Sequence, residues 1–296
     1  MSKTNWIPLH VHSQYSILDG TSSLEDLVER AKELGIPSLA LTDQGNMFGA
    51  VEFYKECQSK GIKPIIGCEL YLAPASRLDK RKIPGIPSGF PLILLAKNKQ
   101  GYQNLCQLTS IAHVEGFYYT PRIDKQVLEK YAEGLICLSG SVQGKLSYLI
   151  LQGREEELVE EAQWFASVFK EDFYLELQRH PMSEEDIVKD AMDKESWLLQ
   201  NYRDYVRNQE VVVSRLYQLG KELNISCVAT NGSHYLHRAD WKAHEILMNI
   251  QSGEPCEIWK ETLSGTPNQE SLILKEKSIF LMNTTSNRKS KWPLFL

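Results

Sequence analysis

The chain has 296 residues, a net charge of −5, and 42% hydrophobic and 24% charged residues, a composition close to that of ordinary globular proteins. This excludes collagen, a coiled-coil rod and a wholly disordered chain, and the acidic balance argues against unaided, non-specific DNA binding. No apolar run approaches the roughly 18 residues of a membrane span, and Met1–Pro8 lacks the apolar core of a secretory signal. The six cysteines form no C-x-x-C pair, which excludes a zinc finger and predicts reduced thiols in the cytoplasm.

Apolar runs and amphipathic stretches alternate along the chain. Strands are expected over residues 7–10, 38–43, 63–72, 91–96, 134–139, 173–178 and 225–230. Helices are expected over residues 22–34, 47–60, 100–112, 155–169, 204–223 and 241–250. Ser22 and Glu25 form a capping box at the start of the first helix, and Gly35 ends it. The stretch 75–89 contains Pro, Gly and a cluster of basic residues, and is expected to be a surface loop.

Strands that alternate with helices predict parallel strands with right-handed crossovers. About seven such units in about 250 residues favour a closed or nearly closed α/β barrel, and an open doubly wound sheet is the alternative. Because parallel strands are buried on both faces, these runs should form the core: Leu39–Leu41, Ile65 and Ile66, Leu92–Leu95, Ile136–Leu138 and Val228.

Chemically active side chains fall at the expected strand ends. His10 and His12, spaced i and i+2 on an extended segment, point the same way and can reach one metal ion, and Asp19 follows in the next loop. Other polar residues close later strands or the helices behind them: Asp43, Glu69, His113, Ser139–Ser141 and His234. In a parallel barrel these ends form one face, which predicts a metal-dependent, phosphoesterase-like site. Taken singly, each residue is also explained as a helix cap or a surface group.

Six runs in the same chain order resemble the start of the alpha subunits of bacterial DNA polymerase III, and together they extend from residue 5 to about residue 250. The runs are Leu9–Gly20, Leu41–Gly49, Ile65–Tyr71, Ala112–Tyr119, Tyr174–His180 and Ala229–Leu236. The resemblance identifies a polymerase-and-histidinol-phosphatase (PHP) domain, a distorted, seven-stranded TIM-like α/β barrel. It implies a barrel domain over residues 1–258, with an acidic insertion at about 183–202. Residues 259–296 are then a linker or an aberrant tail, as a truncated gene, a disrupted frame or a cloned fragment would produce.

The resemblance also implies a metal centre with departures from the family pattern. Metal-binding PHP domains hold up to three ions with nine side chains, and six positions match here: His10, His12, Asp19, Glu69, His113 and His234. The family's His, Cys and Asp at the other positions are Gln44, Ser141 and Gly232. Losing these donors predicts that no full cluster forms. A single Mn, Zn or Fe ion held by His10, His12, Glu69 and His234 is the remaining possibility.

Three functions are compatible with these residues. The first is a mainly structural barrel that packs on the polymerase body and, in some family members, on the proofreading exonuclease subunit, with DNA bound only through the full-length polymerase. The second is a metal-dependent 3′–5′ exonuclease, and the third a free-standing histidinol-phosphatase-like enzyme. Residues 1–296 contain no polymerase palm signature, so this chain alone is not expected to extend a primer. His180 is expected to be a structural or rim residue, and His237 and His244 to be solvated.

Overall fold

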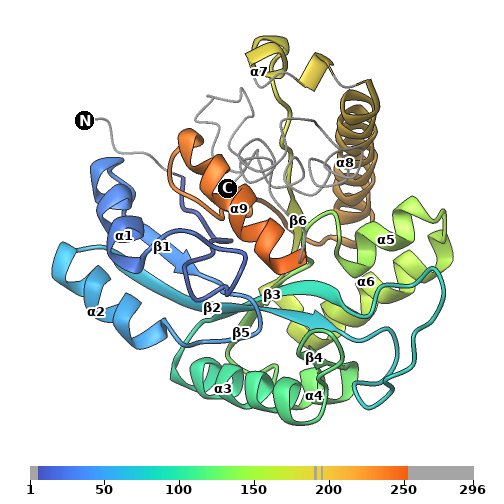
Figure 1. Ribbon diagram of the computed structural model, residues 1–296. Helices are drawn as coiled ribbons and strands as arrows, with labels where there is room; N and C mark the ends of the chain where they lie inside the picture. The colour runs from blue at the N-terminus through green and yellow to red at the C-terminus, as the bar shows by residue number, and fades with distance from the viewer. Residues whose placement is uncertain (1–5, 190–191, 195, 253–296) are drawn as a thin grey trace.

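The computed structural model describes residues 6–189, 192–194 and 196–252, so the predicted tail 259–296 and Cys256 lie outside the described residues. Its centre is a curled, seven-stranded, mostly parallel sheet (Figure 1). The strand order is β1-β2-β3-β5-β6-β7, with β4 paired to β2. The strands are β1 (Ser38–Leu41), β2 (Lys63–Leu72), β3 (Phe90–Ala96), β4 (Arg122–Ile123), β5 (Leu135–Leu138), β6 (Phe173–Leu177) and β7 (Cys227–Ala229).

The N-terminal extended segment joins the two ends of this sheet. On one side, the N–H groups of Ala40 and Thr42 donate to the carbonyls of Pro8 and Val11 at 3.0 and 2.8 Å. On the other side, Val11 forms a parallel bridge with Ser233, just beyond β7. The sheet is therefore connected around a ring, in agreement with the distorted barrel expected from the sequence.

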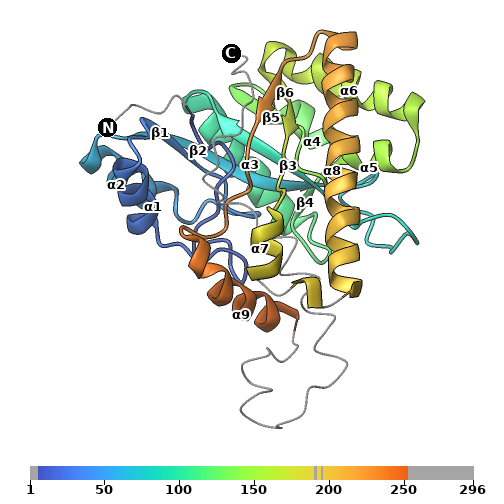
Figure 2. The same ribbon diagram turned by 90° about the horizontal axis from the view of Figure 1, so that it is seen from above.

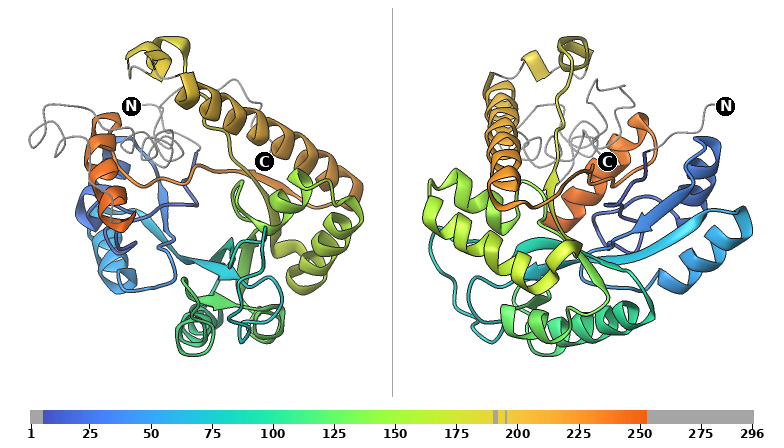
Figure 3. Two further views of the ribbon diagram at one scale, coloured as in Figure 1. Left: turned by 45° about the vertical axis from the view of Figure 1, so that its right-hand side comes forward. Right: turned by 180° about the vertical axis from the view of Figure 1, so that it is seen from behind.

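Helices surround the curled sheet, and α9 lies in front of it in the view of Figure 1 (Figures 1 and 3). They are α1 (Leu24–Glu33), α2 (Ala50–Lys60), α3 (Lys99–Val114), α4 (Lys125–Lys130), α5 (Lys145–Leu151), α6 (Glu155–Phe169), α7 (Glu184–Lys189), α8 (Ser196–Leu223) and α9 (Trp241–Ser252). Short 3₁₀ turns, η1 (Lys170–Asp172), η2 (Met192–Lys194) and η3 (Arg238–Asp240), connect some of them. Figure 2 shows α8 on one side of the sheet, with α1 and α9 on the other side.

The topology differs from the sequence prediction in several features. Residues 7–10, expected as a strand, belong to none of the named strands, and β4, which was not expected, is one of the seven. Strand β3 runs antiparallel to both β2 and β5, because the loop 73–89 returns the chain directly instead of crossing over through a helix. The acidic insertion is helical: α7 and η2 lie within residues 183–202, and α8 begins at Ser196 instead of residue 204. A one-residue shift also occurs at α1, where Ser23, not Ser22, is the N-cap and accepts a hydrogen bond from the Asp26 N–H.

The predicted core is largely correct. Leu39–Leu41 and Leu92–Leu95 are buried, as are Cys137 and Leu138. Ile65, Ile66, Ile136 and Val228 are only half-buried. Ile65, Ile136 and Val228 pack against the buried cluster of Ala40, Ile93, Leu95 and Leu138, and Ile66 packs against a second buried cluster that includes Leu39 and Leu41. In the described part of the chain, no helix is long and apolar enough to cross a membrane, and the five cysteines found there are all free thiols.

Candidate metal site

Two histidines from the N-terminal segment and one glutamate from β2 meet inside the ring. The Nε2 atom of His10 lies 3.1 Å from Nε2 of His12 and 3.0 Å from Oε2 of Glu69. All three residues are buried, and their ligand atoms lie within 4.8 Å of one another. Backbone pairing on both sides of residues 8–12 positions the two imidazoles, as their i, i+2 spacing predicted.

Asp19 and His234 form a second group that shares His12. Oδ2 of Asp19 lies 3.0 Å from Nδ1 of His234, and the His234 ring stacks on the His12 ring at 4.2 Å between centroids. Neither Oδ2 nor Nδ1 has a hydrogen-bond partner within the described residues, although both are buried. Two unsatisfied buried acceptors are costly unless a cation or proton lies between them, so this pair fits a metal ion.

A hydrogen-bond chain fixes the orientation of His12. Its Nδ1 is 3.0 Å from the Ser16 hydroxyl, and that hydroxyl donates to Oδ1 of Asp43 at 2.7 Å. Because the Ser16 proton is given to Asp43, the His12 Nδ1–H must be the donor to Ser16, which leaves the Nε2 lone pair facing Glu69. Ser13 adds two further hydrogen bonds to Asp43. Asp43 is therefore a supporting residue rather than a direct ligand.

Glu176 on β6 orients His10 in the same way and was not predicted from the sequence. Its Oε1 lies 2.9 Å from Nδ1 of His10, and it also accepts hydrogen bonds from Gln178 Nε2 (3.0 Å) and from the Thr230 hydroxyl. A carboxylate behind a histidine typically fixes the ring and raises its basicity as a metal ligand. The available signal was a lone carboxylate between Leu175 and Leu177 in a buried strand.

The charges of the cluster are strongly coupled. Burial by itself lowers the pKa of His10, but the charges of Glu176 and Glu69 and the hydrogen bonds to them outweigh burial and raise this pKa to about 10. Burial, together with the neighbouring His234, His10 and His244, lowers the pKa of His12 well below its usual value. Burial raises the pKa of Asp19, but His234 outweighs it, so the net shift is downward. The lowered pKa values of Asp19 and His12 suit a cation, whereas His10 carries a proton at neutral pH that a metal ion bound at its Nε2 would have to displace.

Of the six predicted ligands, five lie in these two groups and His113 does not. His113 is exposed at the end of α3, and its Nε2–H donates to the carbonyl of Gly45 at 2.8 Å. Among the described residues, neither three-residue group includes it.

The three positions that differ from the family pattern are not equally close to the cluster. Gln44 forms a parallel bridge with Glu69, and a Cβ atom added to Gly232 would lie 3.7 Å from Cε1 and 3.8 Å from Nε2 of the His10 ring. The hydrogen bonds of Ser141 are confined to its own turn and the start of α5, with Gln143 and Ser147. Gly232 is not among the glycines with positive φ, so its backbone accepts a side chain.

The burial of the remaining histidines agrees only in part with the sequence prediction. His237 is exposed, as expected. His244 on α9 was expected to be solvated but is buried, with its ring 5.6 Å from His234 and 5.5 Å from Tyr235. The prediction failed because α9 covers the cluster instead of facing solvent on all sides. His180 is buried, with its Nδ1 2.9 Å from Nε2 of Gln209.

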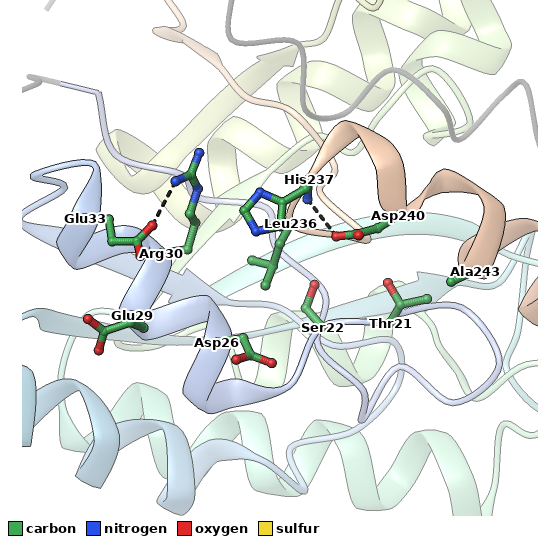
Figure 4. Close-up of a pocket in the computed structure, with 10 residues that line it drawn as sticks. All are labelled: Thr21, Ser22, Asp26, Glu29, Arg30, Glu33, Leu236, His237, Asp240 and Ala243. Atoms are coloured by element: carbon green, nitrogen blue, oxygen red, sulfur yellow. Dashed lines mark hydrogen bonds and ion pairs between the residues drawn. The ribbon is translucent and has the colours of Figure 1, made fainter. Parts of the chain in front are cut away.

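A cavity of about 490 Å³ lies beside the cluster, between α1 and the start of α9. Figure 4 shows its lining, which includes Glu33 paired with Arg30 and Asp240 accepting from the His237 N–H. Thr21 connects it to the site by donating to the carbonyl of His234. None of the ligand side chains lines this cavity, so it is separate from the metal site.

The fold and the cluster agree with a family match. The family model described as "PHP domain" matches residues 8–180, and the chain belongs to this family. Within it, the chain is 51% identical over 275 residues to DNA polymerase III subunit alpha of Chlamydia pneumoniae, an alignment that covers 93% of this chain and 22% of the relative. The corresponding subunit of Thermus aquaticus is 41% identical over 285 residues, covering 93% and 21%. The chain therefore spans about a fifth of the length of these relatives.

Solved structures resemble this chain only distantly. One is a two-domain protein from Bacteroides vulgatus containing a predicted PHP-like metal-dependent phosphoesterase. It has a TM-score of 0.44 and 12% identity, over 84% of this chain and 55% of that one.

Proposed function

We propose that this chain is the PHP barrel of a DNA polymerase III alpha subunit and serves DNA replication mainly as a structural domain. The observation that carries the proposal is the 51% identity over 93% of the chain to an alpha subunit, in the region that also holds the PHP match. The partners would be the polymerase body and, as in some family members, a proofreading exonuclease subunit, with DNA bound only through the full-length polymerase. We expect the protein in the cytoplasm, where bacterial replication occurs.

We further propose that the barrel retains a reduced metal site that holds at most one divalent ion, weakly. His10, His12 and Glu69, or His12, Asp19 and His234, would hold it; both sets combine imidazole nitrogens with one carboxylate, which suits Mn, Zn or Fe. Because the two sets share His12, they compete for one ligand. The family pattern compensates with bridging donors at the positions of Gln44, Ser141 and Gly232, where this chain has an amide, a hydroxyl and no side chain.

A second candidate is a 3′–5′ exonuclease, favoured by the unsatisfied Asp19 and His234 pair. A bound divalent ion would supply an activated water for attack on phosphorus. In the chain itself, Ser16 and Glu176 hold His12 and His10 in the required orientation, and Asp19 and His234 place a carboxylate oxygen and an imidazole nitrogen 3.0 Å apart beside them. A free-standing histidinol-phosphatase-like role has no observation in its favour beyond the shared fold.

Hydrolysis of an end-labelled oligonucleotide tests the two candidates. With added Mn²⁺ or Zn²⁺, we expect the wild-type chain to release no nucleotides. In a separate metal-binding measurement, we expect the triple variant Gln44→His, Ser141→Cys, Gly232→Asp to bind the metal more tightly than the wild type. Release of 3′ nucleotides by the wild type that is abolished by a chelator and by His12→Ala would replace the structural role with the exonuclease.

A further inference from the structure

Three consecutive aromatic residues between α3 and β4 are displayed at the surface; we call Phe117, Tyr118 and Tyr119 the aromatic rim. Phe117 is 49% and Tyr119 73% exposed. Tyr119 has a φ of 62°, a left-handed conformation that bulky residues rarely adopt. A 3.0 Å hydrogen bond from the Tyr118 N–H to the Thr120 carbonyl connects the residues on either side of Tyr119. A strained, exposed aromatic residue that its surroundings hold in place indicates a functional contact.

A basic segment, which we call the basic loop (residues 77–82), is fixed beside the rim by Arg122. The Arg122 side chain is almost fully buried, and its guanidinium donates to the carbonyls of Arg77 and Asp79 in the basic loop and to that of Gly116 just before the rim. Its Cζ also lies 5.0 Å from the centroid of the Tyr118 ring. Because one guanidinium binds both segments, the rim and the loop form one unit.

The basic loop carries net positive charge. It contains four basic residues and one acidic residue, Asp79. Arg77 is neutralised by Glu115 and Asp124, and Arg81 pairs with Asp79. Lys80 and Lys82 have no ion pair among the described residues, and these exposed side chains supply positive charge beside the rings.

The rim is close to the metal site. The His113 ring, which stacks beside Phe117 at 6.3 Å between centroids, donates to the carbonyl of Gly45. The N–H of Gly45 in turn donates to the carbonyl of Glu69 at 2.7 Å. One ring contact and two hydrogen bonds therefore link the rim to the backbone of Glu69, a residue of the cluster.

We propose that the aromatic rim and the basic loop bind single-stranded nucleic acid beside the metal site. Sites for single strands combine positive side chains that follow the phosphates with aromatic rings on which bases stack. A duplex hides the faces of its bases, and the core of a protein–protein interface is normally poor in lysine, so both fit this surface less well. The inference goes beyond the proposed structural role, in which DNA is bound only through the full-length polymerase, because it gives the barrel a single-strand site of its own.

The test measures binding without catalysis, by fluorescence anisotropy of an end-labelled oligothymidylate of about 12 nucleotides with metal-free protein in a chelator. The variant Tyr119→Asn removes the ring and keeps a residue that tolerates the left-handed conformation. We expect it to bind about fivefold or more weakly than the wild type. Substituting Gln for Lys80, Arg81 and Lys82 should lower the slope of log affinity against log salt by about 2.

The matched control is Tyr217→Asn on α8, an exposed tyrosine that also has a lysine, Lys221, over its ring. It should bind as the wild type does. Absence of oligothymidylate binding by the wild type would overturn the proposal and leave the rim as a protein-contact face; equal affinities for Tyr119→Asn and Tyr217→Asn would also overturn it. Failure of the proposed metal site would leave these measurements unchanged, because no metal is present in them.

Discussion

Replacing Glu176 by Gln should reveal how strongly the His10–Glu176 pair supports the barrel. The side chain of Glu176 is fully buried and that of His10 is 4% exposed, with Nδ1 and Oε1 2.9 Å apart. At an effective dielectric constant of about 20 the gross attraction is about 6 kcal/mol, and desolvation of both charges offsets part of it. The amide of Gln can keep its oxygen at the Oε1 position and still accept from Thr230 and Gln178. The loss is therefore mainly one of charge, and we expect about 3 kcal/mol of destabilisation.

Urea unfolding at neutral pH in a chelator measures this difference directly. The matched control is Glu33→Gln, which breaks an exposed pair with Arg30 and should cost less than about 1 kcal/mol. If Glu176→Gln cost no more than Glu33→Gln, the inference that a buried ion pair holds His10 would be refuted. A double variant with His10→Gln should cost less than the sum of the two single changes, because each removes the same interaction.

Three further outcomes follow from individual residues. Burial lowers the pKa of His180 from 6.5 to about 4. Between these pH values His180 therefore binds a proton in the unfolded chain but not in the native state. Stability should therefore fall by about 3 kcal/mol as the pH drops from 6.5 to about 4. In urea unfolding, the free energy of unfolding of His180→Gln should not show this fall between pH 6.5 and about 4. If the variant showed the same dependence on pH as the wild type, the inference about His180 would be contradicted. Leu18 has a φ of 63°, a conformation that glycine adopts without strain. Thermal unfolding should therefore show Leu18→Gly to be more stable than the wild type by up to about 1 kcal/mol. The control Ile17→Gly should be less stable, because Ile17 has no positive φ. Arg122→Gln should cost about 3 kcal/mol, because buried carbonyls lose their donor, and should speed tryptic cleavage within residues 77–82; wild-type cleavage rates would exclude the Arg122 contacts as the support of this loop.

The sequence was sufficient for elements whose signals are local. Strand β2 was predicted with its observed bounds, because an apolar run follows Gly61, the left-handed C-cap of α2. Helix α6 was likewise predicted with its observed bounds from its amphipathic spacing. The direction of β3 was not predictable, because a fully buried strand has the same apolar run in either direction. The short elements β4, α4 and α5 were missed, since two to seven residues carry too little periodicity.

The candidate site was predictable where the ligands lie close to strand ends, and less so where tertiary packing decides. His10 and His12 are placed by their spacing, and Glu69 and His234 by their positions in or just after strands. Glu176 and His244 join the site through contacts between elements far apart in sequence, 166 residues apart for His10 and Glu176. His113 is in a matching motif, but the end of α3 directs its ring to the Gly45 carbonyl. Helix-end geometry of this kind is not visible in the sequence.

The metal content of the purified chain tests the central claim, a PHP barrel with a reduced metal site. The protein is stripped with a chelator, equilibrated with Mn²⁺ or Zn²⁺, passed through metal-free buffer and analysed for its elemental content, with His12→Ala and the triple variant Gln44→His, Ser141→Cys, Gly232→Asp in parallel. We expect no more than one ion per wild-type chain, less for His12→Ala, which removes the ligand that both groups share, and more for the triple variant. Two or three ions retained by the wild-type chain would contradict the reduced site.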